Sequence, residues 1–95
     1  MKTQKKVEVI PEYVEFIPDI LEFGKVYISK EYGVCIHNCL CGCGGKSVMD
    51  IKPKCKYGWN LIENKDKISF TPSILNTDCP NKSHYIITNN IANFV

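Results

Sequence analysis

Three cysteines within five residues constrain this chain more than any other feature. They lie in the segment Cys39-Leu40-Cys41-Gly42-Cys43-Gly44-Gly45, and Cys79 follows far along the chain. Thiolates are soft ligands that favour zinc or iron over magnesium or calcium. A tetrahedral zinc site needs four ligands, and glycine tolerates the left-handed dihedral angles that turn successive sulfurs inward. The segment therefore predicts a metal site, with one zinc ion bound by Cys39, Cys41, Cys43 and Cys79.

The spacing of these cysteines leaves the ligand set open. Alternate positions of a regular strand share one face but lie too far apart for one ion, so the segment must curl. His84 or His37 could replace one thiolate. A zinc with three protein ligands would keep an open position for catalysis, whereas a zinc with four thiolates is structural. Cys35 and Cys55 are expected to be ordinary small apolar residues.

Length and charge narrow the class of protein. A chain of 95 residues fits one domain, whose modest core a metal would supplement. The net charge of +2 argues against a protein that mainly neutralises phosphates. No apolar run could span a bilayer, and no secretory signal is visible. We expect a single zinc-binding β domain over residues 1–95 with residues 1–5 as a flexible tail, in the cytoplasm, without nucleic-acid or membrane partners.

Short runs of β-branched and aromatic residues, separated by turn-forming residues, predict a mostly β fold with hairpins. We expect one hairpin from Trp59 to Phe70 and a second from Tyr85 to Phe94, the latter turning at Asn89-Asn90. Residues 18–23 could form one short helical turn that ends at Gly24. Further strands are expected at Lys6–Ile10, Lys25–Ser29, Gly33–Asn38 and Lys46–Ile51.

A second group of reactive side chains lies between Ser73 and His84. A histidine beside a serine can act as a general base for attack on a carbonyl group. Ser83 and His84 are adjacent, so their side chains would point to opposite faces of a strand. Ser73 could reach His84 if their two segments lie side by side. Either serine could instead stabilise a turn, and His84 could bind the metal or lie in the core.

These motifs in combination resemble a small bacterial family. The chain contains a stretch from Gly24 to Tyr32, then HNCLCGCG at residues 37–44, Trp59, PSI at residues 72–74, Cys79, and SHYII at residues 83–87. In this order, from about Pro18 onward, they resemble the family called domain of unknown function 6527. The gap between Cys79 and Ser83 is slightly longer than the usual gap of that family.

The resemblance implies a bacterial protein encoded near ubiquitin-like proteins and their activating and conjugating enzymes, in operons linked to antiphage defence. Such a pathway requires a protease that trims or removes the modifier. The serine and histidine positions of the family correspond here to Ser73 or Ser83 and His84 or His37. The resemblance thus implies a zinc-stabilised peptidase or esterase whose partners are the ubiquitin-like protein and its conjugation enzymes.

A binding module without chemistry is the alternative. A zinc-ribbon-like adaptor for the same pathway would recognise its partner through an exposed β surface. Tyr13, Phe16 and Tyr32 are the aromatic residues that would then matter more than Ser73.

Overall fold

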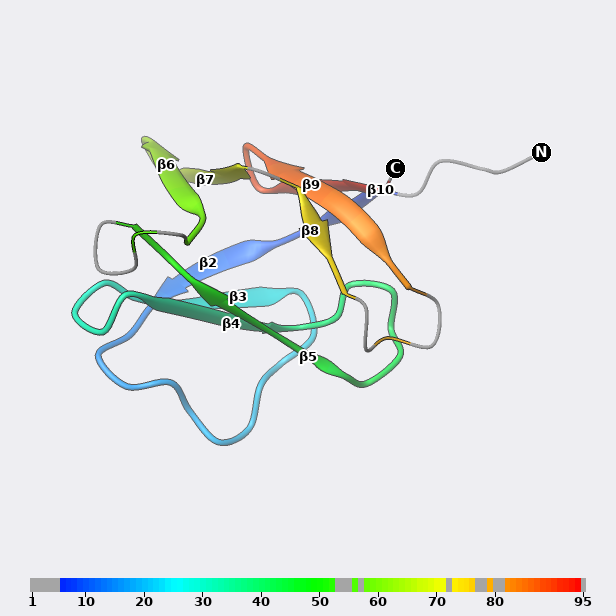
Figure 1. Cartoon of the computed structure of the whole chain (residues 1–95), viewed down its shortest axis with the longest axis horizontal. Helices are drawn as coiled ribbons and strands as arrows, with labels where there is room; N and C mark the ends of the chain where they lie inside the picture. Colours follow the sequence, from blue (N-terminus) through cyan, green and yellow to red (C-terminus); the bar gives the residue numbers. More distant parts are fainter. Residues whose placement is uncertain are drawn as a thin grey trace.

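The computed structural model describes residues 6–52, 56, 58–71, 73–76, 79 and 82–94. This part of the chain folds as an all-β domain without helices (Figure 1). The first sheet has the strand order β2 (Ile10–Tyr13), β3 (Lys25–Ser29), β4 (Val34–Asn38) and β5 (Lys46–Asp50). The second has the order β1 (Lys6–Glu8), β10 (Ile91–Phe94), β9 (His84–Thr88) and β8 (Ile74–Leu75). β6 (Asn60–Asn64) and β7 (Lys67–Thr71) form a separate hairpin.

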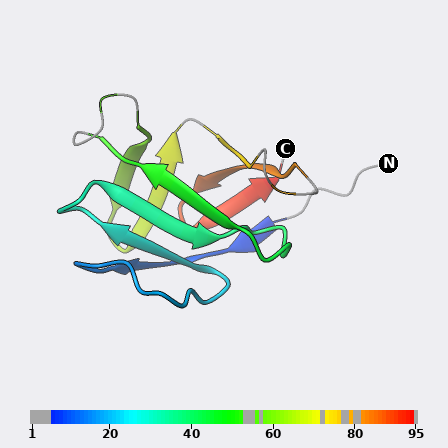
Figure 2. The ribbon, with the colours of Figure 1, turned by 60° about the horizontal axis from the view of Figure 1, so that its bottom comes forward.

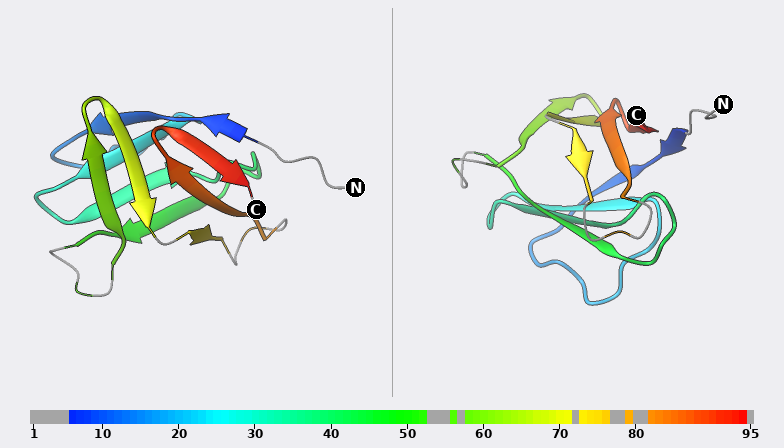
Figure 3. Two further views of the ribbon diagram at one scale, coloured as in Figure 1. Left: turned by 90° about the horizontal axis from the view of Figure 1, so that it is seen from above. Right: turned by 45° about the vertical axis from the view of Figure 1, so that its right-hand side comes forward.

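The two sheets lie in separate layers, and the β6–β7 hairpin lies in the same layer as β9 and β10 (Figures 2 and 3). Side chains alternate across each strand, so β4 and β5 bury every second residue. The core between the layers contains large side chains such as Ile28, Met49, Phe70 and Tyr85. β5 and β8 each lie at a free edge of their sheet.

Both predicted hairpins are present. Asn89 and Asn90, between β9 and β10, have φ angles of 48° and 69°, which is the left-handed region that a tight hairpin turn requires. In the other hairpin Ile68 and Phe70 are buried, and Trp59 packs partly buried against the same core. The hairpins are joined because the Asn90 amide donates to the Ile68 carbonyl and its side chain accepts from the Ile68 amide.

Other local predictions differ from the structure. The expected strand Lys6–Ile10 is divided at Val9, where the chain crosses from the second sheet to the first. Residues 18–23 form bends and a turn instead of a helical turn, and β8 was not predicted. The proposed flexible tail at residues 1–5, and Cys55, lie outside the described residues. The described residues include no helix with the length and apolar character that crossing a membrane requires.

Candidate functional site

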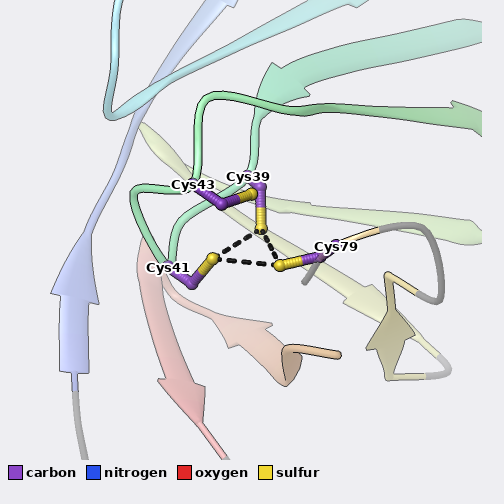
Figure 4. A group of neighbouring side chains, drawn as sticks. All are labelled: Cys39, Cys41, Cys43 and Cys79. Atoms are coloured by element: carbon purple, nitrogen blue, oxygen red, sulfur yellow. Dashed lines mark hydrogen bonds between the residues drawn. The ribbon is translucent and has the colours of Figure 1, made fainter. Parts of the chain in front are cut away.

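Four cysteine sulfurs meet where the two layers join. Cys39, Cys41 and Cys43 lie in the loop between β4 and β5, and Cys79 lies in the connection between β8 and β9. Their four Sγ atoms lie within 4.8 Å of one another. The Sγ of Cys41 is 3.3 Å from that of Cys39 and 3.2 Å from that of Cys79, and Figure 4 shows these sulfurs pointing toward one another. The four cysteines form one compact group from two distant segments.

The β4–β5 loop curls as the spacing of its cysteines requires. The Cys39 amide donates to the Gly45 carbonyl at 2.8 Å, and the Gly42 amide donates back to the Cys39 carbonyl at 3.1 Å. Gly42 and Gly44 both have a φ of 87°, which a side chain would disfavour. These turns bring sulfurs from alternate residues to one side of the loop.

The geometry of this group suits a metal ion. A tetrahedral zinc with Zn–S bonds of about 2.3 Å separates its sulfurs by about 3.8 Å. The Sγ atoms of Cys39 and Cys79 lie 3.8 Å apart, and the Sγ of Cys41 lies closer, at 3.3 Å and 3.2 Å from them. The Gly45 amide lowers the pKa of Cys43, but hydrogen bonds with Cys79 and Cys41 outweigh it and raise that pKa to about 12. A bound cation reverses that balance because it stabilises thiolates. The four cysteines could therefore hold one metal ion, and neither histidine belongs to the group.

Several polar side chains surround the sulfur of Cys39. The Cys39 Sγ lies 3.0 Å from Ser83 Oγ and accepts a hydrogen bond from Asn76 Nδ2 at 3.3 Å. The same Nδ2 lies 3.1 Å from Tyr85 Oη, and Asn76 Oδ1 accepts from Ser47 Oγ at 2.9 Å. Asn76 thus connects both sheets to the sulfur group. The only signal for Asn76 in the sequence is a polar residue between Ser73 and Cys79. Ser83 contacts the sulfur of Cys39, and no hydrogen bond joins its hydroxyl to a histidine in the described part of the chain.

His37 is enclosed by the core. It is 0% exposed, and its Nε2 lies 2.7 Å from Tyr85 Oη. Its Nδ1 has no hydrogen-bond partner among the described residues. Burial lowers the pKa of His37 to about 4 and raises that of Tyr85 to about 12, so both groups are neutral near pH 7. His37 therefore supports the core and cannot meet a substrate in this conformation.

Ser73 and His84 form a hydrogen bond between neighbouring strands. Ser73 directly precedes β8, and His84 begins β9. Leu75 pairs with His84, and directly paired side chains share one face of a sheet. Ser73, two residues before Leu75, points to the same face. Its Oγ lies 2.7 Å from His84 Nε2, and both side chains are partly exposed.

No carboxylate forms an ion pair with His84 within the described part of the chain. The acidic groups that form ion pairs there contact lysines: Glu12 and Glu22 bind Lys25, and Glu63 binds Lys30. The described residues therefore provide a Ser–His pair without an acidic third member. Such a pair has the contact that general-base activation of a serine requires.

Comparison with known proteins gives a family match over most of the chain. The model of the family described as "Bacterial ubiquitination-like system serine protease (BubE)" matches residues 13–95. That description does not contain the name domain of unknown function 6527, so this identification stays a prediction. No curated protein and no solved structure matches the chain.

Proposed function

Because the chain belongs to the BubE family of serine proteases of bacterial ubiquitination-like systems, we propose that it is a zinc-stabilised serine peptidase or esterase that releases a ubiquitin-like modifier. The observation that carries this proposal is the 2.7 Å contact between Ser73 Oγ and His84 Nε2. Ubiquitin-like proteins and their conjugation enzymes are its proposed partners. A single domain, a cytoplasmic location and a role in antiphage defence are further parts of the proposal.

Ser73 is the proposed nucleophile and His84 the proposed general base. As Ser73 Oγ bonds to the carbonyl carbon of the substrate, His84 Nε2 accepts the hydroxyl proton. The tetrahedral intermediate expels the leaving amine or alcohol, which takes that proton from His84. A water molecule then attacks the acyl group on Ser73 while His84 accepts its proton, and the carboxylate product leaves as Ser73 regains a proton from His84.

The sulfur group has a different proposed role. Zinc bound by Cys39, Cys41, Cys43 and Cys79 would act as a cross-link, because four thiolates leave no open position for water or substrate. Cys79 lies in the chain between Ser73 and His84. Anchoring Cys79 to the β4–β5 loop therefore restricts the connection whose two ends carry the reacting side chains.

Substitution of the two reacting residues tests this proposal. Ser73→Ala and His84→Ala should abolish cleavage of a ubiquitin-like protein extended or conjugated at its C-terminus, because nucleophile or base is lost. Ser69→Ala, on β7, is a matched control that should retain cleavage. Metal content and melting temperature, measured on all three variants, should match the parent protein. Loss of metal from Ser73→Ala or His84→Ala would mean that the residue is structural, and the mechanism would fail.

An exposed aromatic pair favours the adaptor as the second candidate function. Phe16 and Tyr32 are 66% and 56% exposed, and their ring centroids lie 5.6 Å apart. Exposed aromatic groups often mark protein-binding surfaces. An adaptor should lose affinity for the ubiquitin-like protein in Phe16→Ala and Tyr32→Ala but not in Ser73→Ala. Cleavage by the parent protein would exclude a purely adaptor function.

A further inference from the structure

Two free strand edges from different sheets line one groove. β5 is the outer strand of the first sheet and β8 the outer strand of the second. The groove has a volume of about 540 Å³, with Val48 of β5 and Leu75 of β8 on its walls, Trp59 in its lining, and Cys43 and Gly44 from the sulfur loop. Unpaired strand edges carry backbone donors and acceptors that can bind another extended chain.

The hydrogen-bond phase of β8 shows which backbone groups face outward. The Asn76 amide donates to the Ser83 carbonyl at 2.9 Å. Backbone groups alternate in direction along an antiparallel strand, so Ile74 faces β9 as Asn76 does, whereas the amide and carbonyl of Leu75 face away. No backbone hydrogen bond outside the sheet reaches Leu75 in the described part of the chain. The edge of β8 is thus open at Leu75.

The same alternation places the backbone of Ser73 on this outer edge. Its carbonyl accepts from Trp59 Nε1 at 3.4 Å, which confirms the direction. A strand added beside Leu75 would therefore pair there and stop beside Ser73, where Trp59 occupies the next acceptor. Ser73 and His84 do not line the groove itself, but the backbone edge of β8 that borders it continues to Ser73.

The edge of β5 also has outward-facing backbone groups, but it is less suitable for an added strand that must reach Ser73. The Cys39–Gly45 and Ile51–Gly33 backbone bonds fix its phase, so the amide of Val48 faces away from β4. Farther along this edge the Trp59 amide donates to the Asp50 carbonyl at 2.8 Å. A Cβ at Gly58 would collide with that carbonyl, so glycine permits this close approach. The β5 edge is thus already covered at one end and does not carry Ser73.

We propose that the groove binds the C-terminal tail of the ubiquitin-like substrate as an extended peptide, which adds as a strand to the free edge of β8 at Leu75. This inference rests on the proposed function, because the edge of β8 that borders the groove continues to the proposed nucleophile Ser73. Strand addition recognises main-chain groups and needs an extended, unstructured segment. A tail with that property can enter the groove while the folded part of the modifier stays outside.

Binding of backbone-modified peptides to the metal-loaded Ser73→Ala protein tests the inference without cleavage. The probes are fluorescent synthetic peptides with the tail sequence of a ubiquitin-like protein from the same kind of system, each N-methylated at one successive residue. Because only alternate amides of an added strand face its partner, methylation should weaken binding about tenfold at every second position, the loss of one hydrogen bond. Equal effects at neighbouring positions would overturn the inference.

Substitutions in the protein test which edge is used. In the Ser73→Ala background, Leu75→Pro removes the outward amide and should weaken binding about tenfold. Leu75→Ala keeps that amide and only trims a wall of the groove, so it should weaken binding by less than Leu75→Pro does. Metal content and melting temperature verify folding. Weaker binding in Val48→Pro but not in Leu75→Pro would assign the strand to β5 and overturn the inference.

The remaining outcomes separate this inference from the proposed function. Cleavage of the tail peptide by the unsubstituted protein, with no alternation in the methylation series, would leave the function standing and overturn the docking mode. Alternating losses without any cleavage would support the docking mode and contradict the function. A dimer of the protein that Leu75→Pro dissociates, with no peptide binding, would show that a second copy occupies the edge and would overturn the inference.

Discussion

The sulfur group and the Ser73–His84 pair share one connection of the chain but arise in different ways. Cys39 and Cys79 are 40 residues apart and come from opposite layers, whereas Ser73 and His84 are 11 residues apart on adjacent strands. The four sulfurs lie within 4.8 Å of one another and could hold a cation, whereas Ser73 and His84 meet in one hydrogen bond. The comparison separates the proposed structural site from the proposed catalytic site.

The largest expected effect comes from breaking the sulfur group. Cys41→Ser, or removal of metal by a chelator, should unfold the domain, because a structural zinc contributes about 10 kcal/mol or more and a small domain has only about 5–15 kcal/mol of stability. Circular dichroism and metal analysis measure the loss. Cys35→Ala is the control: Cys35 is buried in the core outside the group, so this variant should keep its metal. A chelated protein that stays folded would contradict the structural role.

The two serines provide the next test of the comparison. Ser73→Ala should lower cleavage by a factor of about a thousand or more with its metal intact, as nucleophile loss does in serine proteases. Ser83 lies against the sulfur of Cys39, so Ser83→Ala should weaken metal binding by about 10–100-fold and keep the chemistry when metal is in excess. Competition with a zinc chelator and a cleavage assay measure the two effects. Loss of metal binding in Ser73→Ala, together with loss of cleavage in metal-loaded Ser83→Ala, would reverse the roles assigned to the two serines.

Asn76→Ala should modestly weaken the contacts that join the sulfur group to both sheets. It removes the hydrogen bonds to Cys39, Tyr85 and Ser47, and we expect a loss of about 1–3 kcal/mol in unfolding free energy because buried partners are left unsatisfied. Chemical denaturation of metal-loaded protein measures this loss. Ser69→Ala, which removes only the hydrogen bond from the Asn89 amide, serves as a control with a smaller change. An Asn76→Ala protein of unchanged stability would contradict the role of Asn76 in joining both sheets to the sulfur group.

The smallest effect should come from a surface group remote from both sites. Glu63 accepts from Lys30 Nζ and Tyr13 Oη at 2.7 Å and 2.6 Å, and these hydrogen bonds lower the pKa of its carboxyl group. The stabilisation is present above the pKa of the unfolded chain and is lost as the pH falls through the lowered folded pKa. Glu63→Gln should cost about 0–1 kcal/mol near neutral pH, as exposed pairs do.

The pH dependence of the melting temperature tests the lowered pKa of Glu63. The difference in melting temperature between Glu63→Gln and the parent should shrink as the pH falls below about 4, where the carboxyl group becomes protonated in both states. Metal content and cleavage at neutral pH should equal those of the parent. A difference that grows toward low pH would contradict the assigned direction of the pKa shift.

The sequence predicts the sulfur group and the hairpins better than it predicts β8. The cysteine group was predictable because Cys39, Cys41 and Cys43 lie close together in sequence, so ligand density alone indicates a metal. The hairpins were predictable from their turn residues, with Asn89-Asn90 as the clearest case. β8 was not, because a strand of two residues has no pattern of its own and exists only through pairing with β9.

For the proposed catalytic pair, the sequence narrowed the candidates but could not choose among them. Alternation along a strand argued against Ser83 as the partner of His84, yet only the register of Leu75 with His84 brings Ser73 into contact. His37 was a further candidate through the family resemblance, and its enclosure beside Tyr85 depends on packing between the two sheets. Asn76 makes its contacts through tertiary structure alone, which no local pattern encodes.

Labelling with a serine-reactive fluorophosphonate probe tests most directly whether the Ser73–His84 pair is the catalytic site and the sulfur group is only structural. Mass spectrometry of the metal-loaded protein should locate the label on Ser73, and His84→Ala should lose the label while keeping its metal and its melting temperature. Label on Ser83, or no label on a folded, metal-loaded protein, would contradict the account.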